Sequence, residues 1–382
     1  MLGNTRRFVL DEVLQDEGLY SDWDDGGTVT DGGIDSGYRR YILLKWLLIF
    51  ACIAVCIVVA GLAITVGTYP IEFGESYWLI WNHIFGEVPD NPADILYIKD
   101  HVVWDLRLPR ILIGIIAGAG LAVAGATMQS TLKNPLADPY TTGISSGAAF
   151  GATVAICYGF GIFGTGTIVA NAFVFSLIPT AIIALISLTK KVSPVSMILA
   201  GIAVMYIFNA MTTVMMLWAN PDDMAAVYQW QVGSFEGLSW SSVPIMFAMT
   251  LVGSIVLLLL SNKMNVLATG DENAKALGID ASKLRLVCLI IVSLVTASIV
   301  SFTGIIGFVG LVAPHVVRIF IGSDNKYLMP ASMAFGAALL LVADLVGRTV
   351  IAPATLEVGV VTAFIGGPLF LYLVVRQRKE AW

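Results

Sequence analysis

The sequence predicts an all-α integral membrane protein with about ten membrane-spanning helices. Of its 382 residues, 57% are apolar and only 13% are charged, and the mean hydropathy is +0.84. A soluble domain carries about 25% charged residues, so this chain cannot cover itself with a water-facing surface. Long uncharged stretches recur, each close to the roughly 20 residues that a helix needs to cross a bilayer. They do not alternate apolar and polar residues as barrel strands do, so we expect helices.

The first 40 residues differ from the rest of the chain. Nine of the 27 acidic residues lie between Asp11 and Asp35, among repeated glycines and without an apolar period. Such a composition is typical of disordered segments, so residues 1–40 are expected to form a disordered acidic tail, with a partner-binding tail as the alternative. A signal peptide is excluded because its first part would be cationic. Residues 41–382 are expected to form the transmembrane domain.

Ten apolar stretches in this domain have the length and composition of membrane spans. We expect them near residues 42–67, 108–130, 141–159, 165–188, 194–219, 242–261, 286–303, 307–321, 328–347 and 358–375. The four cysteines lie inside apolar segments and have no metal-ligand or redox spacing. The sequence therefore indicates no metal site and no cofactor.

The distribution of cations provides an independent check on these spans. With the N-terminus placed in the cytoplasm, the outer segments contain only Lys99, Arg107, Arg110 and Arg348, and the other 17 of the 21 Lys and Arg residues lie inside. Inner loops of membrane proteins are rich in Lys and Arg, and a miscounted span would mix the two sides. The asymmetry therefore supports the number of spans and predicts that both termini are cytoplasmic.

Glycines at four-residue spacing predict close packing between helices. They occur at Gly114 and Gly118, and again at Gly143, Gly147 and Gly151. Small residues at this spacing allow helix backbones in a membrane to approach one another. The pattern indicates tight packing and is not specific for a function.

The chain lacks the residues that would drive transport by itself. No lysine follows a glycine, so a phosphate-binding P-loop is absent and another polypeptide must hydrolyse any ATP that is used. Asp344 is the clearest intramembrane candidate for ion coupling, but its spacing from Arg348 favours an i,i+4 ion pair. A secondary transporter or channel that works alone remains the alternative function. A membrane-embedded enzyme is disfavoured because no nucleophile, metal or acid–base groups converge.

Two polar loops stand out between the spans. Residues 262–285 form the longest internal polar stretch on the inner side, and their core, 270–278, begins with acidic residues and ends with glycine. This pattern predicts a short helix along the membrane surface, and a plain connecting loop is the alternative. On the outer side, residues 220–240 are polar and aromatic and predict a short interfacial helix.

From about Trp104 to Arg378 the sequence resembles the FecCD-type permeases of type II ATP-binding-cassette importers, which carry ferric siderophores, haem and cobalamin. The motifs that carry the resemblance are RLPR at 107–110, GATMQ at 125–129, NPLADP at 134–139, GISSGA at 143–148, LAG at 199–201, PDD at 221–223, Trp230 with Gly233 and Ser234, GFVGLVAPH at 307–315 with Arg318, and Ala343 with Asp344. Together and in this order they are highly specific. The acidic tail is not part of the family pattern.

The resemblance implies the architecture and the partners. A homodimer of ten-span subunits would lie in the cell membrane, with two ATP-binding subunits in the cytoplasm and a substrate-binding protein outside. The permease itself would not be an enzyme, and no nucleic acid is implied. A ferric siderophore is the first choice of cargo, followed by cobalamin, haem or molybdate.

The resemblance also assigns roles to particular residues. It implies that Arg107, Arg110 and Arg348 dock the binding protein through its glutamates, for which planar guanidinium groups are suited. Snorkelling or contact with lipid phosphate is the alternative for these arginines. The loop 262–285 would be the coupling loop that contacts the ATPase, through Gly270, Asp271, Glu272, Ala274, Ala276, Leu277 and Gly278. The cytoplasmic gate would be formed by Asn134 and Leu136 together with Pro194 and Val195, where family members often have small hydroxyl residues.

Overall fold

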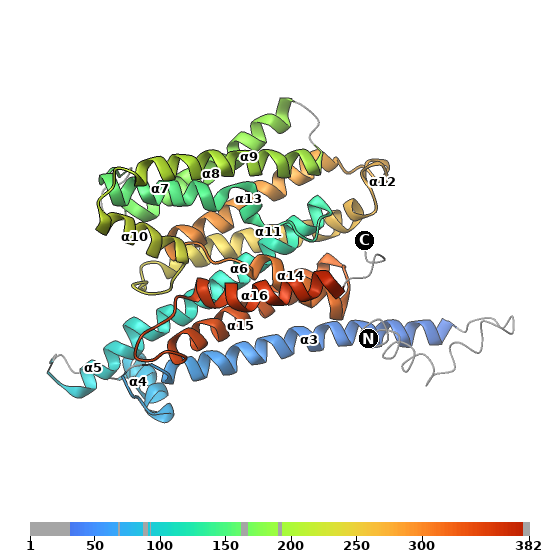
Figure 1. The fold of residues 1–382 in the computed structure, drawn as a ribbon. Helices are drawn as coiled ribbons and strands as arrows, with labels where there is room; N and C mark the ends of the chain where they lie inside the picture. The colour runs from blue at the N-terminus through green and yellow to red at the C-terminus, as the bar shows by residue number, and fades with distance from the viewer. Residues whose placement is uncertain are drawn as a thin grey trace. The chain divides into compact units, whose positions relative to one another are not determined.

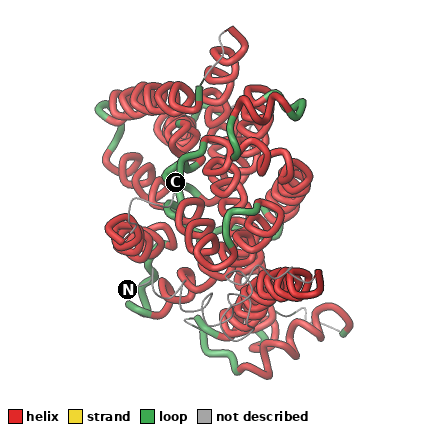
Figure 2. The backbone as a smooth tube through the Cα atoms, turned by 90° about the vertical axis from the view of Figure 1, so that its right-hand side faces the viewer, coloured by secondary structure: helices red, strands yellow, loops and turns green. Residues whose placement is uncertain are grey.

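The computed structural model describes residues 31–67, 69–86, 91, 93–161, 167–189 and 193–376. The described residues are helices joined by loops, with no strand among them (Figure 2). The chain divides into two compact units, Met1–Phe50 and Ala51–Trp382. What is described of the first unit is the beginning of one long helix, and the second unit contains the other helices.

The helices follow one another in a simple order. They are α3 (Asp31–Thr65), α4 (Phe73–Phe85), α5 (Ile95–His101), the π-helical η1 (Val102–Arg107), α6 (Leu108–Leu132), the 3-10 helix η2 (Pro139–Thr142), α7 (Ile144–Tyr158), α8 (Thr167–Thr189), α9 (Pro194–Met216), α10 (Pro221–Val232), α11 (Val243–Ala268), α12 (Asp271–Ala276), α13 (Ala281–Thr303), α14 (Val309–Ile321), α15 (Asn325–Thr349) and α16 (Val358–Arg376). Among the described residues, seven apolar stretches are long enough to cross a membrane, and α7, α14 and α16 are shorter apolar helices. The prediction of about ten apolar spans is confirmed for this part of the chain.

The first span begins earlier than predicted. α3 starts at Asp31, so residues 31–40 are helical where the sequence predicted the end of a disordered tail. Extending an existing helix costs far less than nucleating a new one, because each added residue gains a hydrogen bond. The apolar span therefore supports additional turns on its N-terminal side. The rest of the predicted tail, residues 1–30, lies outside the described residues.

Within the second unit, α6 is the central helix. It packs against α11, α13, α14 and α15, and most of its side chains are buried (Figure 1). At the crossing with α15, a Cβ atom added to Gly118 would lie 2.4 Å from the carbonyl oxygen of Gly336. The two backbones are therefore in direct contact, as the glycine spacing predicted.

The crossing of α6 and α14 explains two of the sequence motifs. Pro314 lies inside α14 and has no N–H to donate to the carbonyl of Gly310, four residues earlier. The Gln129 side-chain amide reaches over from α6, with Nε2 3.5 Å from Gly310 O and 3.2 Å from Leu311 O. Gly125 makes room for this contact, because a Cβ there would collide with Gly310 O. The glutamine therefore donates to the carbonyl that the proline leaves without its helical partner and to the neighbouring carbonyl of Leu311.

The pair α7 and α8 packs in the same way. Cβ atoms on Gly147 and Gly151 would each lie 2.5 Å from a carbonyl oxygen of α8, those of Phe175 and Asn171. Both glycines belong to the ridge that the sequence identified. The prediction that these ridges pack helices closely is confirmed.

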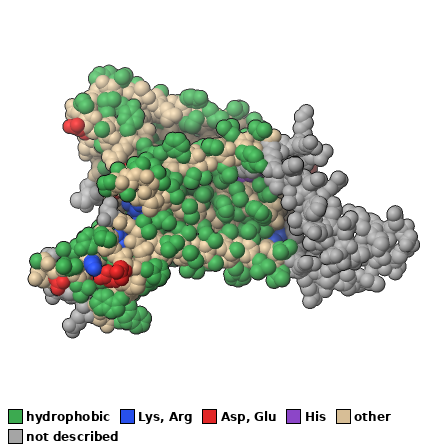
Figure 3. All heavy atoms as spheres, turned by 60° about the horizontal axis from the view of Figure 1, so that its bottom comes forward, with side chains coloured by type: hydrophobic (Ala, Val, Ile, Leu, Met, Phe, Trp, Pro, Cys, Tyr) green, Lys and Arg blue, Asp and Glu red, His purple; other side chains and the backbone are tan. Residues whose placement is uncertain are grey.

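The surface agrees with a lipid environment. In Figure 3 hydrophobic side chains cover the middle of the visible face, whereas the acidic and basic ones lie mostly toward its ends. α9 and α11 also expose large apolar side chains, among them Tyr206 and Leu259. In water such exposure would be unfavourable, but in a bilayer it is the expected outer layer of a helical bundle.

Candidate functional site

The two ends of the second unit carry different polar groups. α6 is flanked by Arg107 at its start and Lys133 at its end, and its neighbour α15 runs the opposite way, from Asn325 toward Arg348. We call the end that carries Arg107 and Arg348 the arginine end. The other end carries α12 and is called the α12 end. Figure 1 shows α4, α5 and α10 on the left at the arginine end and α12 on the right.

At the α12 end, the short helix predicted within residues 262–285 is present. α12 begins after Gly270, whose φ of 130° places it in a region that favours glycine, and Asp271 and Glu272 stand in the first turn. It ends in a Schellman motif, in which Ile279 N–H donates to Ala274 O at 2.8 Å and Gly278 has a φ of 80°. The acidic start and the terminal glycine were the signals in the sequence.

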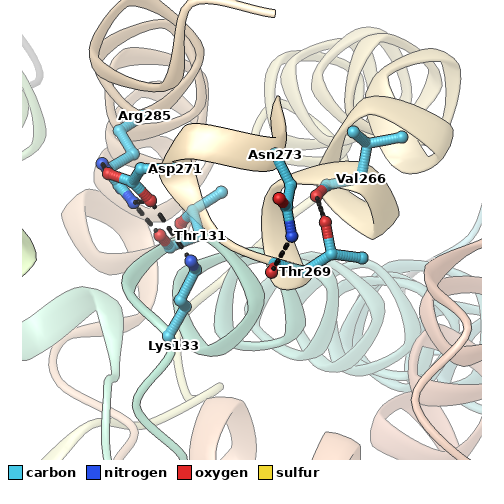
Figure 4. Close-up of polar contacts among 7 residues, drawn as sticks. All are labelled: Thr131, Lys133, Val266, Thr269, Asp271, Asn273 and Arg285. Atoms are coloured by element: carbon cyan, nitrogen blue, oxygen red, sulfur yellow. Dashed lines mark hydrogen bonds and ion pairs between the residues drawn. The ribbon is translucent and has the colours of Figure 1, made fainter. Parts of the chain in front are cut away.

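Asp271 ties α12 to two other helices (Figure 4). Arg285 of α13 donates to both carboxylate oxygens of Asp271, at 2.8 and 2.6 Å, and Lys133 at the end of α6 lies 3.2 Å from one of them. Arg285 also donates through Nε to Thr131 O, one of the last carbonyls of α6, at 3.0 Å. These contacts lower the pKa of Asp271 to about 2, with the hydrogen bonds from Arg285 as the largest cause. The carboxylate therefore remains ionised at physiological pH.

The other predicted coupling residues divide between an anchored and an exposed side of α12. Ala274 is completely buried in a core cluster that includes Met264 and Leu267 of α11. Glu272, Ala276, Leu277 and Gly278 are exposed. The short helix is thus anchored on its inner side and presents a mixed polar and apolar surface on its outer side.

The predicted gate residues lie in two segments at the same end. Lys133 caps the end of α6, and the Asn134 side chain accepts a hydrogen bond from Leu136 N–H at 2.9 Å, which closes a tight turn. In the second segment Pro194 is the first residue of α9, and Val195 is exposed, as is Leu136. Ala137 and Met197, which follow these segments, belong to the same buried cluster. The structure places both segments at the α12 end.

The same turn contains a buried carboxyl group that the sequence analysis did not single out. Asp138 is buried, accepts a hydrogen bond from Tyr140 N–H at 3.1 Å, and has its pKa raised to about 6 by burial. Tyr140 OH donates to Ile306 O at 3.0 Å, and burial raises its pKa. Asp138 caps the start of the 3-10 helix η2 and fixes the path of the chain from the turn to α7. Its place before Pro139 was the available signal.

At the arginine end, two arginines bind the end of α3. Arg107 donates to Ile64 O at 2.7 Å and to Thr65 O at 3.1 Å, and it also contacts Tyr69 O. Arg348 donates to carbonyls of the same helix end, at 2.8 Å to Val66 O and 3.2 Å to Ala63 O. The last carbonyls of a helix have no partner within the helix and favour cations. Arg107 and Arg348 therefore cap α3.

The third arginine joins this group through Asp344. One carboxylate oxygen lies 2.8 Å from Arg110 Nε and the other 3.0 Å from Arg348 Nε. The i,i+4 pair of Asp344 with Arg348 is confirmed, whereas the sequence did not reveal the pairing with Arg110. We call Arg107, Arg110, Arg348 and Asp344 the arginine cluster; with three guanidinium groups and one carboxylate it carries a formal charge of +2.

The sequence assigned Arg107, Arg110 and Arg348 to docking of a partner, but in the structure these side chains are largely covered by other parts of the chain. Arg107 is buried, and the Arg348 side chain is only 8% exposed. Arg110 retains the most access, with 17% of its side chain exposed. The physical reason is that the end of α3 and Asp344 cover these arginines and accept hydrogen bonds from Arg107, Arg110 and Arg348.

An apolar groove of about 530 Å³ opens beside the arginine end, between α10, the α13–α14 connection and α16. Its lining includes Phe308, a non-glycine residue with a φ of 69°. The α13–α14 connection, residues 304–308, is non-helical. Irregular backbone between membrane helices is tolerated where protein covers it or where it lines a cavity. The lining residues are Gln231, Val232, Ile305, Gly307, Phe308, Gly359, Val360, Ala363, Phe364 and Pro368.

This arrangement matches a known class of membrane protein. Residues 53–376 match the FecCD transport family. The chain belongs to this family. Members of the FecCD family are the membrane-spanning permeases of importers for metal chelates; a separate ATPase subunit hydrolyses ATP and a substrate-binding protein acts with them. The chain is accordingly a multi-pass permease of the cell membrane and not an enzyme.

Individual relatives agree with the family assignment. An ABC transporter permease protein of Methanocaldococcus jannaschii is 44% identical over 289 residues, which cover 73% of this chain and 83% of the relative. The cobalamin import system permease protein BtuC of Halobacterium salinarum is 40% identical over 280 residues, covering 73% and 74%. A solved metal-chelate type ABC transporter in an inward-facing conformation has a TM-score of 0.75 and 30% identity, covering 86% of this chain and 99% of that one.

Proposed function

We propose that the chain works as a homodimeric permease in which α12 receives the movement of two cytoplasmic ATPase subunits. The observation that carries this proposal is the attachment of α12. The helix exposes Glu272, Ala276 and Leu277, while Asp271 connects it to α13 and to the end of α6. A force applied to the exposed side is therefore passed to two membrane helices.

The same contacts suggest how the cytoplasmic gate is reached. Lys133, which binds Asp271, immediately precedes Asn134 and the tight turn that ends at Leu136. When ATPase closure displaces α12, we expect this turn to move with it. Asn134 and Leu136 would face Pro194 and Val195 as a constriction, which opens and closes with the ATPase cycle. A bulky residue at position 134 should then block uptake while the complex still assembles.

This proposal fixes an orientation. The α12 end would lie in the cytoplasm together with both termini and the acidic tail, which was predicted for residues 1–40. The arginine end would lie outside the cell. The distribution of Lys and Arg along the sequence supports this orientation.

The arginine cluster is proposed as the docking site for the extracytoplasmic binding protein. Its charge of +2 would attract acidic side chains, and electrostatic complementarity raises association rates and fixes orientation even where contacts are partly buried. Arg110 has the greatest access and should form the direct contact. Arg107 and Arg348 would contribute mainly through their charge, because both side chains are buried. Arg110→Gln should lower the ATPase activity that the binding protein stimulates, without changing assembly with the ATPase subunits; unchanged stimulation would contradict the docking role.

A second copy of the chain is proposed to face the apolar groove at the α10–α16 side. Phe308, Phe364 and Pro368 present an apolar wall there that water would not favour. Two such walls facing each other across a two-fold axis would form a weakly hydrophobic conduit. The cargo is proposed to be a ferric siderophore, with cobalamin, haem or molybdate as alternatives; the cobalamin permease among the relatives supports a bulky metal chelate.

Reconstitution tests the proposal. Proteoliposomes should accumulate the metal chelate only when the chain, its ATPase, the binding protein and ATP are all present. Omitting any one of them should abolish uptake. Accumulation against a gradient by the chain alone would contradict the proposal and identify a secondary transporter.

A further inference from the structure

One face of α4 is rich in aromatic side chains that none of the roles above uses. Phe73, Tyr77, Trp81 and Phe85 recur at intervals of four residues, and they are between 40% and 68% exposed. We call these four residues the aromatic stripe. Neighbouring rings contact one another, with centroids 4.9 Å apart for Phe73 and Tyr77 and 4.5 Å apart for Trp81 and Phe85. The interval places all four on one side of the helix.

The opposite side of α4 is fixed to the rest of the second unit. Leu79 is buried, and the glutamate and the histidine of the helix turn toward α5, where Glu75 pairs with Lys99 and His83 with Asp100. The His83 ring also stacks on Trp104, with centroids 3.9 Å apart. Rotation of α4 that would hide the aromatic stripe is therefore blocked. The charged groups face protein and the aromatic rings face outward.

The depth of α4 follows from its contact with α3. Leu79 shares a buried cluster with Cys56 and Ile64 of α3, and the hydroxyl of Tyr77 lies close to Gly61, where an added Cβ would be 2.5 Å from it. Gly61 precedes the end of α3 by four residues, which is roughly 6 Å along the helix axis. The aromatic stripe thus lies beside the last turns of a membrane span and not beyond its end.

We propose that the aromatic stripe lies in the interface of the lipid bilayer, at the boundary between headgroups and acyl chains. Trp and Tyr are enriched at this depth because their rings are apolar and their N–H or O–H groups reach water. A helix with an apolar face opposite a polar one lies in the plane of this boundary. α4 has this composition and, through its contact with α3, this depth.

The surface around the stripe favours lipid over a protein partner. Val58 and Leu62 flank Gly61 on α3 and are exposed, so the aromatic stripe continues the apolar surface of a membrane span. The stripe also contains no charged residue, whereas the proposed docking site for a binding protein is the charged arginine cluster. With its aromatic stripe in the interface, α4 would hold the end of α3, and the arginines that cap it, at a constant depth in the membrane.

Depth-dependent quenching tests this proposal in the intact chain in nanodiscs. Trp81→Cys would carry a bimane label, and Glu236→Cys, at an exposed polar site of the arginine end, is the matched control. At position 81 we expect stronger quenching by a nitroxide near the lipid headgroup than by one near the bilayer centre. Aqueous iodide should quench position 81 at least about threefold less than position 236. Unmodified chain corrects for labelling of the native cysteines, and Phe73→Cys repeats the measurement at a second position of the stripe.

Three results would overturn the proposal. Equal iodide quenching at positions 81 and 236 would place the stripe in water. Protection from iodide that appears only when the binding protein is added would assign the stripe to that protein. Disulfide cross-linking of two copies of the unlabelled Trp81→Cys variant through position 81 would assign the stripe to a dimer contact. Since none of these measurements depends on ATP or cargo, failure here is distinct from failure of the proposed transport function.

Discussion

Asparagine in place of Asp271 would keep the size of the side chain but remove the charge that holds α12 to α6 and α13. Arg285 would lose one of its two acceptor oxygens, and Lys133, 3.2 Å away, would lose a charged partner. If α12 transmits the movement of the ATPase, Asp271→Asn should leave ATP hydrolysis intact but loosen its connection to transport. We therefore expect fewer chelates imported per ATP hydrolysed.

The magnitude follows from the exposure of the two partners. The Arg285 side chain is 2% exposed, and removing the partner of a buried ion pair costs about 3–5 kcal/mol. The Asp271 side chain is 49% exposed, so water already screens part of its charge and the effect must be discounted. After this discount, Asp271 holds α12 to α6 and α13 with about 1–2 kcal/mol of free energy. This corresponds to a factor of about 5–30 in an equilibrium between coupled and uncoupled positions of α12.

The pH dependence of this connection has a definite sign. Because the pKa of Asp271 is lowered from 3.8 to about 2, the contribution of the pair is present above pH 4 and is lost as the pH falls through about 2. Between pH 6 and pH 8 the difference between wild type and Asp271→Asn should therefore be constant. A difference that changed in this range would point to another titrating group.

The assay is uptake per ATP hydrolysed in proteoliposomes that contain the ATPase subunits and the binding protein. We expect the ratio to fall about 5- to 30-fold in Asp271→Asn, and about twofold in Lys133→Gln, which removes one partly exposed contact. Asp222→Asn, the same chemical change at an exposed position of α10, is the control and should match wild type. A normal ratio in Asp271→Asn, with the ATPase subunits still bound, would refute the role of this pair in coupling.

Three further predictions concern stability. Gln129→Leu removes the amide that donates hydrogen bonds to carbonyls in the first turn of α14. The free energy of unfolding should fall by about 1 kcal/mol, which would be measured as a lower midpoint of thermal unfolding in detergent. Gly118→Val should separate α6 from α15 and lower the yield of folded protein sharply, because its Cβ would lie 2.4 Å from Gly336 O, whereas Gly74→Ala has open space and should be neutral. Asp138, with a pKa raised to about 6, binds its proton more tightly in the folded state; stability should increase as pH falls from 7 to 4, by up to about 3 kcal/mol. Asp138→Asn should remove this pH dependence and should be more stable than wild type at pH 8; a midpoint that is equally pH-dependent in both proteins would contradict the assignment to Asp138.

The sequence predicted the spans and the short helix within residues 262–285 because their signals are local. A run of about 20 apolar residues defines a span wherever it occurs. Likewise, the acidic start at Asp271 and the glycine at position 278 specify both ends of α12 without reference to the rest of the chain. Glycine spacing predicted the α6–α15 crossing in part, since it identified Gly118 but not its partner Gly336.

The sequence could not predict the ion pairs, because these join residues far apart in the chain. Lys133 and Asp271 are separated by 138 positions, and Arg110 and Asp344 by 234. Nor does cation counting distinguish an arginine that faces a partner from one that caps a helix, since both lie at the end of a span. For Arg348 the sequence indicated the i,i+4 pair with Asp344, but it did not indicate the carbonyls at the end of α3 that accept its hydrogen bonds.

At both ends of the second unit an arginine binds carbonyls at a helix end and pairs with an aspartate, but the two aspartates differ in their access to water. Arg285 binds a carbonyl at the end of α6 and pairs with Asp271, and Arg348 binds carbonyls at the end of α3 and pairs with Asp344. Asp344 is 2% exposed, whereas half of the Asp271 side chain is accessible to water. Separating a buried ion pair costs much free energy. The arginine cluster should therefore stay rigid and act on a partner through its electrostatic potential. The pair at α12 can exchange its contacts for water or for a partner at lower cost, and movement should therefore begin at that end.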